Sequence, residues 1–201
     1  MSENEKHNAK MKRLKTSKQK IFAKKTEKKG LIIVNTGTGK GKSTAAFGMV
    51  FRGIAHGMPC AVVQFIKGAM ATGERDLIQQ HFPELCEFHT LGDGFTWDTQ
   101  DKEKDIASAK KAWCKAKELI SDKKKKIILL DEINIALRYG YVEIDDVITF
   151  LLEKKPKMTH VILTGRNANE KLIGIADLVT DMTLVKHHFR NGVMSQAGIE
   201  F

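Results

Sequence analysis

The fold is decided by residues 31–44, which read Leu-Ile-Ile-Val-Asn-Thr-Gly-Thr-Gly-Lys-Gly-Lys-Ser-Thr. Four apolar residues predict a buried strand, and they lead directly into a glycine-rich turn that ends in Gly41-Lys42-Ser43. Apolar residues at helical spacing follow, which predicts a helix over about residues 42–56. A strand, a glycine-rich turn and a helix in this order are typical of a phosphate-binding loop.

The residue types of this loop suit phosphate chemistry. Glycines let successive backbone N–H groups point toward one anion, and the start of the helix adds unpaired donors and the positive end of its dipole. Lys42 carries a positive charge to the outer phosphates, and the Ser43 hydroxyl is placed for Mg²⁺. We therefore expect the nucleotide to contact the whole loop: Gly37, Thr38, Gly39, Lys40, Gly41, Lys42, Ser43 and Thr44.

The spacing within the loop departs from the common pattern, which is Gly, four residues, and then Gly-Lys-Ser/Thr. Here Thr36 stands where the first glycine is expected, so that the loop counted from Gly37 is one residue short. We expect the loop to hold a triphosphate in a shifted register. The alternative is a glycine-rich turn that binds nothing, which the coincidence of strand, Lys-Ser pair and helix disfavours.

The composition is that of a globular protein with one domain. The chain has 201 residues, of which 42% are hydrophobic, and only 3 are proline, so a substantial core is expected. No apolar run approaches the length of a membrane span, and the N-terminus lacks a stretch of signal-peptide type. Cys60, Cys86 and Cys114 are odd in number and widely spaced, so we interpret all three as reduced packing residues of a cytoplasmic protein.

The formal net charge of +10 is concentrated at the N-terminus. Residues 1–29 contain eleven Lys or Arg against three Glu, a net charge of +8, which leaves +2 for residues 30–201. The folded part is therefore nearly neutral, and we expect no nucleic-acid partner. The basic arm, residues 1–29, is either disordered or a basic amphipathic helix that docks on an acidic surface. Its apolar residues fall roughly on one helical stripe: Met11, Leu14, Ile21 and Phe22.

Strands and helices alternate through the rest of the chain. Apolar runs predict strands at 60–65, 87–91, 127–132, 160–164 and 178–185, and helical periodicity predicts helices at 73–81, 101–122, 144–154 and 169–175. This alternation indicates the α/β class: one phosphate-loop NTPase-like domain over residues 30–201, with a mostly parallel, doubly wound sheet and helices on both faces. In such folds the ligand lies at the carboxyl ends of the strands.

Two of these strand ends carry further candidate site residues. The apolar run 127–130 ends in Asp131 and Glu132, and a carboxylate delivered beside a phosphate loop binds Mg²⁺ directly or through water. The pattern leaves open which acid contacts the metal, since the other acid would serve equally well as a helix cap. Arg166 follows the strand at 160–164 and is the arginine best placed to meet phosphate.

The loop over residues 92–99, Gly-Asp-Gly-Phe-Thr-Trp-Asp-Thr, is the most unusual segment outside the phosphate loop. Phe95 and Trp97 lie between glycines and acids, where no helix or strand period would bury them. Aromatic side chains on a glycine-rich loop often cover a flat ligand. The alternative is that the two rings pin the loop to the core.

Taken together, these stretches resemble the ATP:corrinoid adenosyltransferases of the phosphate-loop type over roughly residues 30–201. Thr38 stands where that family often has Asn or Asp, and Ser43 where Thr is usual. The resemblance rests on six motifs: Thr-Gly-Thr-Gly-Lys-Gly-Lys-Ser-Thr at 36–44, Val-Val-Gln-Phe-Ile-Lys-Gly at 62–68, Gly-Phe-Thr-Trp at 94–97, Leu-Asp-Glu at 130–132, Thr-Gly-Arg at 164–166 and Val-Lys-His at 185–187.

The resemblance implies that cob(I)alamin attacks the 5′-carbon of ATP and that triphosphate leaves, with Lys42 and Mg²⁺ stabilising the leaving group. It implies that Phe95 and Trp97 pack under the corrin and displace its lower axial ligand, which makes reduction of Co(II) by a flavoprotein feasible. It also implies a homodimer in which a basic N-terminal segment folds over a neighbouring active site.

Two other classes of function are compatible with parts of the chain. A generic phosphate-loop ATPase or small-molecule kinase would share the fold, and it would release orthophosphate or transfer a phosphoryl group. A nucleic-acid-binding module with a nucleotide switch is disfavoured because the charge is confined to residues 1–29, where Phe22 is the only stacking aromatic. A GTP switch is disfavoured because the sequence lacks an Asn-Lys-x-Asp segment.

Overall fold

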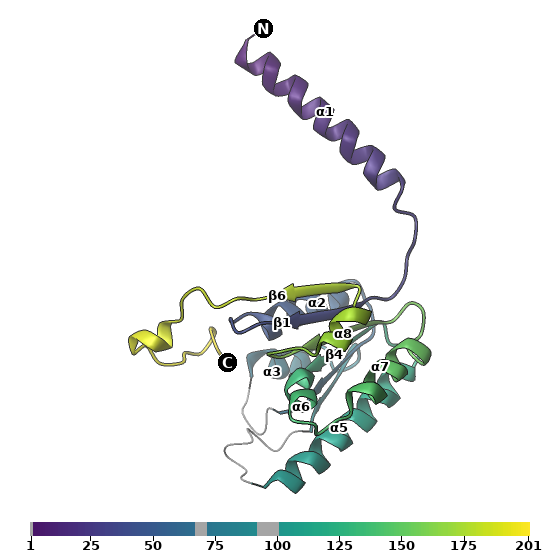
Figure 1. The fold of residues 1–201 in the computed structure, drawn as a ribbon, viewed down its shortest axis with the longest axis vertical. Helices are drawn as coiled ribbons and strands as arrows, with labels where there is room; N and C mark the ends of the chain where they lie inside the picture. The colour runs from purple at the N-terminus through teal and green to yellow at the C-terminus, as the bar shows by residue number, and fades with distance from the viewer. Residues whose placement is uncertain (1, 67–71, 92–100) are drawn as a thin grey trace.

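The computed structural model describes residues 2–66, 72–91 and 101–201, and in this part of the chain six strands form one parallel sheet (Figure 1). The strands lie in the order β3-β2-β4-β5-β1-β6, and every neighbouring pair is parallel. Their carboxyl ends therefore meet at one edge of the sheet. The strands are β1 (Ile32–Thr36), β2 (Cys60–Gln64), β3 (Cys86–Thr90), β4 (Ile127–Asp131), β5 (His160–Thr164) and β6 (Leu178–Asp181).

Helices cover both faces of this sheet, which confirms the predicted fold class. Their apolar side chains join two core clusters, one on each face. On one face lie α2 (Lys42–Ala55) and α3 (Gly73–His81). On the other lie α5 (Lys102–Ser121), α6 (Ile133–Arg138), α7 (Ile144–Glu153) and α8 (Glu170–Ile175). Among the described residues, no helix is both long and apolar enough to cross a bilayer.

The near-continuous apolar strands of the sequence follow from this two-sided cover. In β4, Ile128 and Leu130 join the cluster with α5 and α6, whereas Ile127 and Leu129 join the cluster with α2 and α3. Alternate residues of a strand point to opposite faces, so a strand covered on both faces needs apolar residues at every position. All five residues of β1, β2 and β4 are buried for this reason.

Most expected elements are present, and the differences have local causes. The strand expected over 178–185 ends at Asp181, because the next residue, Met182, turns to the phosphate loop. The Met182 N–H donates to the Thr36 carbonyl at 2.9 Å, and the Met182 carbonyl accepts from the Gly39 N–H at 2.6 Å. The short helices α6 and η1 (His188–Asn191) were not predicted. Helix α6 starts only two residues after β4 ends, so the apolar residues of strand and helix run together in the sequence, and the four residues of η1 are too few to show a helical period.

The basic arm contains helix α1 (Glu3–Ala23), which leads away from the sheet (Figure 1). A capping box between Ser2 and Glu5 begins the helix, and none of its residues is buried. The apolar stripe is therefore exposed, up to 69% at Phe22. After this helix, Lys29 forms an ion pair with the body, since its Nζ lies 2.5 Å from the Asp177 carboxylate.

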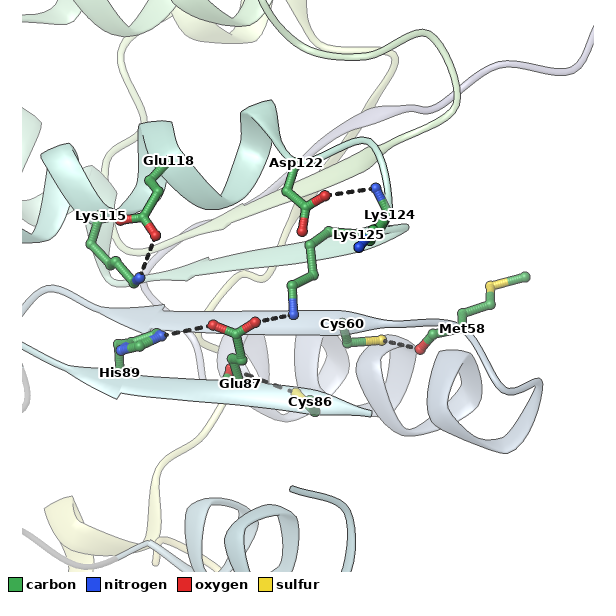
Figure 2. A network of polar contacts seen from close by, with 10 residues as sticks. All are labelled: Met58, Cys60, Cys86, Glu87, His89, Lys115, Glu118, Asp122, Lys124 and Lys125. Carbon is green, nitrogen blue, oxygen red and sulfur yellow. Dashed lines mark hydrogen bonds and ion pairs between the residues drawn. The ribbon is translucent and has the colours of Figure 1, made fainter. Parts of the chain in front are cut away.

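The edge strand β3 is tied to the sheet by a polar network toward the amino end, away from the strand ends that carry the motifs (Figure 2). Glu87 of β3 is ion-paired with Lys125, which precedes β4, and the His89 ring lies 3.4 Å from the same carboxylate. The hydrogen bond from Lys125 lowers the pKa of Glu87. Such a network holds an edge strand that lacks a second neighbour.

The cysteines agree only partly with their interpretation as packing residues. Cys60 and Cys86 are buried at paired positions of β2 and β3, and burial raises their pKa values to about 11 and about 12 (Figure 2). Cys114 of α5 is exposed, so the prediction is wrong for this residue. The preceding residue, Trp113, is buried in the core instead.

Candidate functional site

The phosphate loop joins β1 to α2 at the carboxyl edge of the sheet, and the chain after β6 packs against it. Gly37 has a φ of +100°, and a Cβ on it would lie 2.2 Å from Asp181 Oδ1. A Cβ on Gly39 would lie 2.6 Å from the carbonyl oxygens of Met182 and Thr183. These glycines are therefore required by contact with residues 181–183, a constraint that the loop sequence by itself did not reveal.

Helix α2 begins without a side-chain cap. Gly41 occupies the N-cap position with a φ of +101° and has no side chain that would satisfy the first backbone donors of the helix. A helix of 14 residues that starts in this way presents N–H groups and a positive dipole end to the loop. The start of the helix is fixed to β1 by Asn35, whose Nδ2 donates to the Lys42 carbonyl at 3.2 Å.

Lys42 is the most constrained cation of the loop. Its side chain is buried, and its Nζ donates to the Gly39 carbonyl at 2.5 Å. Burial lowers the pKa of Lys42, Glu132 opposes this shift, and the positive charges of Arg166 and Lys40 add to it. The pKa of Lys42 therefore depends on two residues that lie far from it in the sequence, Glu132 and Arg166. These two come from adjacent segments, because a Cβ on Gly165 would lie 3.2 Å from Glu132 Oε2.

Asp131 and Glu132, which the sequence left equivalent, have different environments. Asp131 is fully buried, and its two oxygens accept hydrogen bonds from Thr164 Oγ1 at 2.8 Å and Gln64 Nε2 at 3.1 Å. Glu132 is half-buried, has a φ of +62° and does not cap α6 with its side chain. Asp131 therefore links β4 to its two neighbours, whereas Glu132 is the acid that acts on Lys42.

Arg166 is presented by an unusual turn after β5. Gly165 before it has a φ of +128°, and Asn167 after it has a φ of +54°. The Gly165 N–H donates to the Asn35 carbonyl at 3.2 Å, and the Ala168 N–H donates to Thr36 Oγ1 at 2.9 Å. These bonds join the turn to β1, which places the exposed Arg166 beside the phosphate loop.

The remaining loop residues line the outer side of the site. Ser43 is half-buried, whereas Thr38, Lys40 and Thr44 are exposed. Lys40 Nζ lies 2.7 Å from a carboxylate oxygen of Glu200, so the C-terminal segment reaches back to the loop. The predicted aromatic residues Phe95 and Trp97 lie outside the described residues.

Several polar residues of the site were not singled out from the sequence. Asn35, Gln64 and Thr164 are buried at the carboxyl ends of β1, β2 and β5, and Asn134 is buried in the first turn of α6. The available signal was a polar residue that ends an otherwise apolar strand, since parallel strands end at the ligand edge. Within the described ranges, no group of three or more His, Cys, Asp or Glu residues has the arrangement of a metal site.

Comparison with known proteins identifies the family of the chain. A family model described as "ATP:corrinoid adenosyltransferase BtuR/CobO/CobP" matches residues 28–201. A corrinoid adenosyltransferase of Sinorhizobium sp is 66% identical over 97% of this chain and 91% of its own length. Corrinoid adenosyltransferases of Pseudomonas aeruginosa and Escherichia coli K12 are 46% and 39% identical, each over 98% of this chain and over 96% and 98% of their own lengths. The chain therefore belongs to the ATP:corrinoid adenosyltransferases, a family of transferase enzymes.

Proposed function

We propose that this chain transfers the 5′-deoxyadenosyl group of ATP to cob(I)alamin or a related corrinoid and releases inorganic triphosphate. The observation that carries the proposal is the packing of the Arg166 turn between the Glu132 segment and the end of β1, from which the glycine-rich loop leads to Lys42. Two cations, a helix N-terminus and a carboxylate suit a polyphosphate and its metal ion. Membership of the adenosyltransferase family supports the same substrates.

In this reaction a cobalt–carbon bond forms at C5′ and the bond from C5′ to the triphosphate oxygen breaks. Cobalt supplies both electrons of the new bond, and the leaving triphosphate keeps the pair from the broken bond. Because the cobalt is itself a strong nucleophile, no protein base is needed, and the protein acts through positioning and electrostatics. The loop that is one residue short would seat the phosphates in a shifted register and expose C5′ to the corrin.

The roles of the cations follow from the charge that grows on the departing triphosphate. Lys42 would exchange the Gly39 carbonyl for phosphate oxygens, and Arg166 would bind an outer phosphate from the β5 side. The amides of residues 37–44 would contribute further donors, with the exception of the Gly39 N–H, which already donates to Met182. We therefore propose that the backbone N–H groups of this loop bind the phosphates without the N–H of Gly39.

Mg²⁺, when bound, neutralises charge on the triphosphate. The residues present fit this ion, because the Ser43 hydroxyl and the Glu132 carboxylate are half-buried oxygen donors at the same edge of the sheet. We propose these two residues as its protein ligands. We propose that Asp131, which is fully buried and holds β2 and β5 through its two oxygens, acts on the metal through water.

Analysis of the released phosphate tests this function against its nearest alternative. With Mg-ATP and chemically prepared cob(I)alamin, we expect the visible spectrum of adenosylcobalamin and one triphosphate for each corrinoid converted. A generic ATPase or kinase would instead release orthophosphate or ADP, and the corrinoid spectrum would not change. Orthophosphate as the main product, with no alkylated corrinoid, would contradict the proposal.

Partners and surroundings complete the proposal. Following the family resemblance, we propose that Phe95 and Trp97 pack against the lower face of the corrin, and that a flavodoxin-like flavoprotein supplies the electron. We propose a homodimer that works in the cytoplasm without nucleic-acid or membrane partners. The unpaired state of Cys60, Cys86 and Cys114 is in keeping with a reducing compartment.

We propose that the basic arm is a docking segment separate from the domain at 30–201. Helix α1 buries no residue, whereas Lys29 and Gly30 contact the body through Asp177 and Lys155. Deletion of residues 1–28 should leave the melting temperature of the ligand-free protein little changed. Corrinoid retention or coupling to the reductant should weaken, and the loss should depend on salt if the docking surface is acidic.

Differential scanning calorimetry and corrinoid binding at two ionic strengths check this prediction. A matched comparison is deletion of residues 1–30, which also removes Lys29 and its ion pair with Asp177. The longer deletion should lower the melting temperature, because the body then loses that ion pair and the Gly30 carbonyl that accepts from Lys155 Nζ at 2.8 Å. A large loss of stability in the shorter deletion would show that the arm belongs to the core.

A further inference from the structure

Asn134 is a buried polar residue whose bonding is incomplete. It lies in the first turn of α6, two residues after Glu132, and is 1% exposed. Its Nδ2 donates to the Gly165 carbonyl at 3.1 Å, while its Oδ1 is buried without a hydrogen-bond partner in the described part of the chain. A buried acceptor without a partner raises the free energy of the folded state. An apolar side chain would avoid this cost but would leave the Gly165 carbonyl without its donor, so the amide is accounted for by the bond that it makes to the turn.

The bond from Asn134 acts on the peptide unit that leads into Arg166. The Gly165 carbonyl and the Arg166 N–H belong to one planar peptide group, so a donor that holds the carbonyl also sets the rotation of that plane. Gly165 has a φ of +128°, in the region where only glycine turns easily, so little in its own backbone resists rotation. On its other side, the Gly165 N–H donates to the Asn35 carbonyl at 3.2 Å.

The contact between α6 and this turn is close. A Cβ on Gly165 would lie 2.9 Å from Asn134 Cβ and 3.2 Å from Glu132 Oε2. The turn that carries Arg166 therefore packs directly on the segment that carries Glu132. The Glu132 N–H donates to Thr164 Oγ1 at 2.9 Å just before the turn, and the Asn134 amide donates to the Gly165 carbonyl within it. The β1 side of the turn is held separately, through Thr36 and Asn35.

We propose that Asn134 is a positioning residue that orients the Gly165–Arg166 peptide and so holds the Arg166 guanidinium at a fixed place relative to Glu132 and Lys42. It does not touch the substrate, and it acts through Arg166. The inference rests on the proposed function, specifically on the role of Arg166 in binding the outer phosphates of ATP. Without the amide, the turn keeps its bonds to β1, but the peptide plane before Arg166 is free to rotate.

The test replaces Asn134 by leucine, an apolar side chain with the same number and branching of heavy atoms. Asn134→Leu should weaken binding of Mg-ATP, measured by isothermal titration calorimetry, by about tenfold, the effect of one well-placed hydrogen bond. Its melting temperature should change little, because the unpaired Oδ1 acceptor is removed while the Gly165 carbonyl loses its donor. A merely structural role predicts the reverse pattern, with a lower melting temperature and unchanged ATP binding, and that result would overturn the inference.

Thr159→Val is the matched control. Thr159 is also 1% exposed, and its hydroxyl donates one hydrogen bond, to the Lys125 carbonyl at 3.0 Å, at the opposite end of the sheet. This variant should lower the melting temperature and leave ATP binding unchanged. If Asn134→Leu does not fold, Asn134→Ala carries the same expectation without added bulk. Failure of both variants to fold would overturn the inference, because Asn134 would then be needed for packing.

A double-mutant cycle separates this inference from the proposed function. If Asn134 acts through Arg166, Asn134→Leu should have little further effect on ATP binding in an Arg166→Ala background. Equal losses in both backgrounds would overturn the inference and leave the proposed function intact. If Arg166→Ala alone leaves ATP binding unchanged, the role of Arg166 in the proposed function is wrong. The positioning role proposed for Asn134 is then wrong as well, because it acts through Arg166.

Discussion

Replacing Lys42 with alanine should lower the rate of adenosyl transfer by about 10²–10³-fold, the usual cost of removing one electrostatic group aimed at a developing charge. The Lys42 ammonium is buried beside the loop and donates to the Gly39 carbonyl at 2.5 Å, so it faces the site rather than the apolar core. Burial lowers the pKa of Lys42, because the surrounding protein replaces water around the ammonium. The melting temperature should therefore not fall.

Single-turnover formation of adenosylcobalamin from prepared cob(I)alamin measures this effect without interference from reduction. Lys110→Ala, which removes an exposed lysine on α5, is the control and should turn over normally. Lys42→Arg should recover part of the rate, because it keeps the charge but replaces a compact ammonium by a larger planar group. Near-normal turnover in a folded Lys42→Ala protein would contradict the role of the loop.

Replacing Phe95 or Trp97 with alanine should separate reduction from alkyl transfer. If the two rings displace the lower axial ligand of the corrin, they serve the formation of cob(I)alamin and have little part in its attack on ATP. Activity should then fall severely in an assay that starts from cob(II)alamin and a flavoprotein reductant. It should largely recover when cob(I)alamin is prepared beforehand with a strong chemical reductant.

The other tryptophan of the chain provides the control. Trp113 packs in the core on α5 and donates its Nε1–H to Asp146 at 2.7 Å, so its role is structural. Trp113→Ala should lower the melting temperature and reduce both activities in proportion. The same proportionate loss in Phe95→Ala or Trp97→Ala, from a protein that still binds ATP, would show that these rings only anchor their loop.

Local sequence was sufficient for the fold class and for the location of the phosphate loop. The apolar run before the loop, the glycines within it and Lys42-Ser43 after it are neighbours in the chain, and their physical preferences need no distant partner. The same holds for the helix expected over 73–81, whose bounds the structure reproduces. Each of these features depends on the residue types within one short segment.

What the sequence by itself determined is therefore the set of candidate residues at the strand ends: Lys42, Ser43, Asp131, Glu132 and Arg166. Their gathering at one edge of the sheet follows from a parallel fold that the sequence predicts. The order of the strands was not predicted. That order places β1 between β5 and β6, and so brings the Arg166 turn and Met182 to opposite sides of the loop.

Only the tertiary structure decided how these residues differ from one another. Asp131 and Glu132 are alike in a sequence, but the hydrogen bonds from Gln64 and Thr164 commit one carboxylate to the sheet and leave the other beside Lys42. Such bonds join residues more than 30 positions apart, and side-chain direction in a packed sheet depends on neighbours that local preference does not encode. For the same reason Asn134, which belongs to no motif, could not be predicted as a site residue, because its hydrogen bond depends on the packing of α6 against the turn after β5.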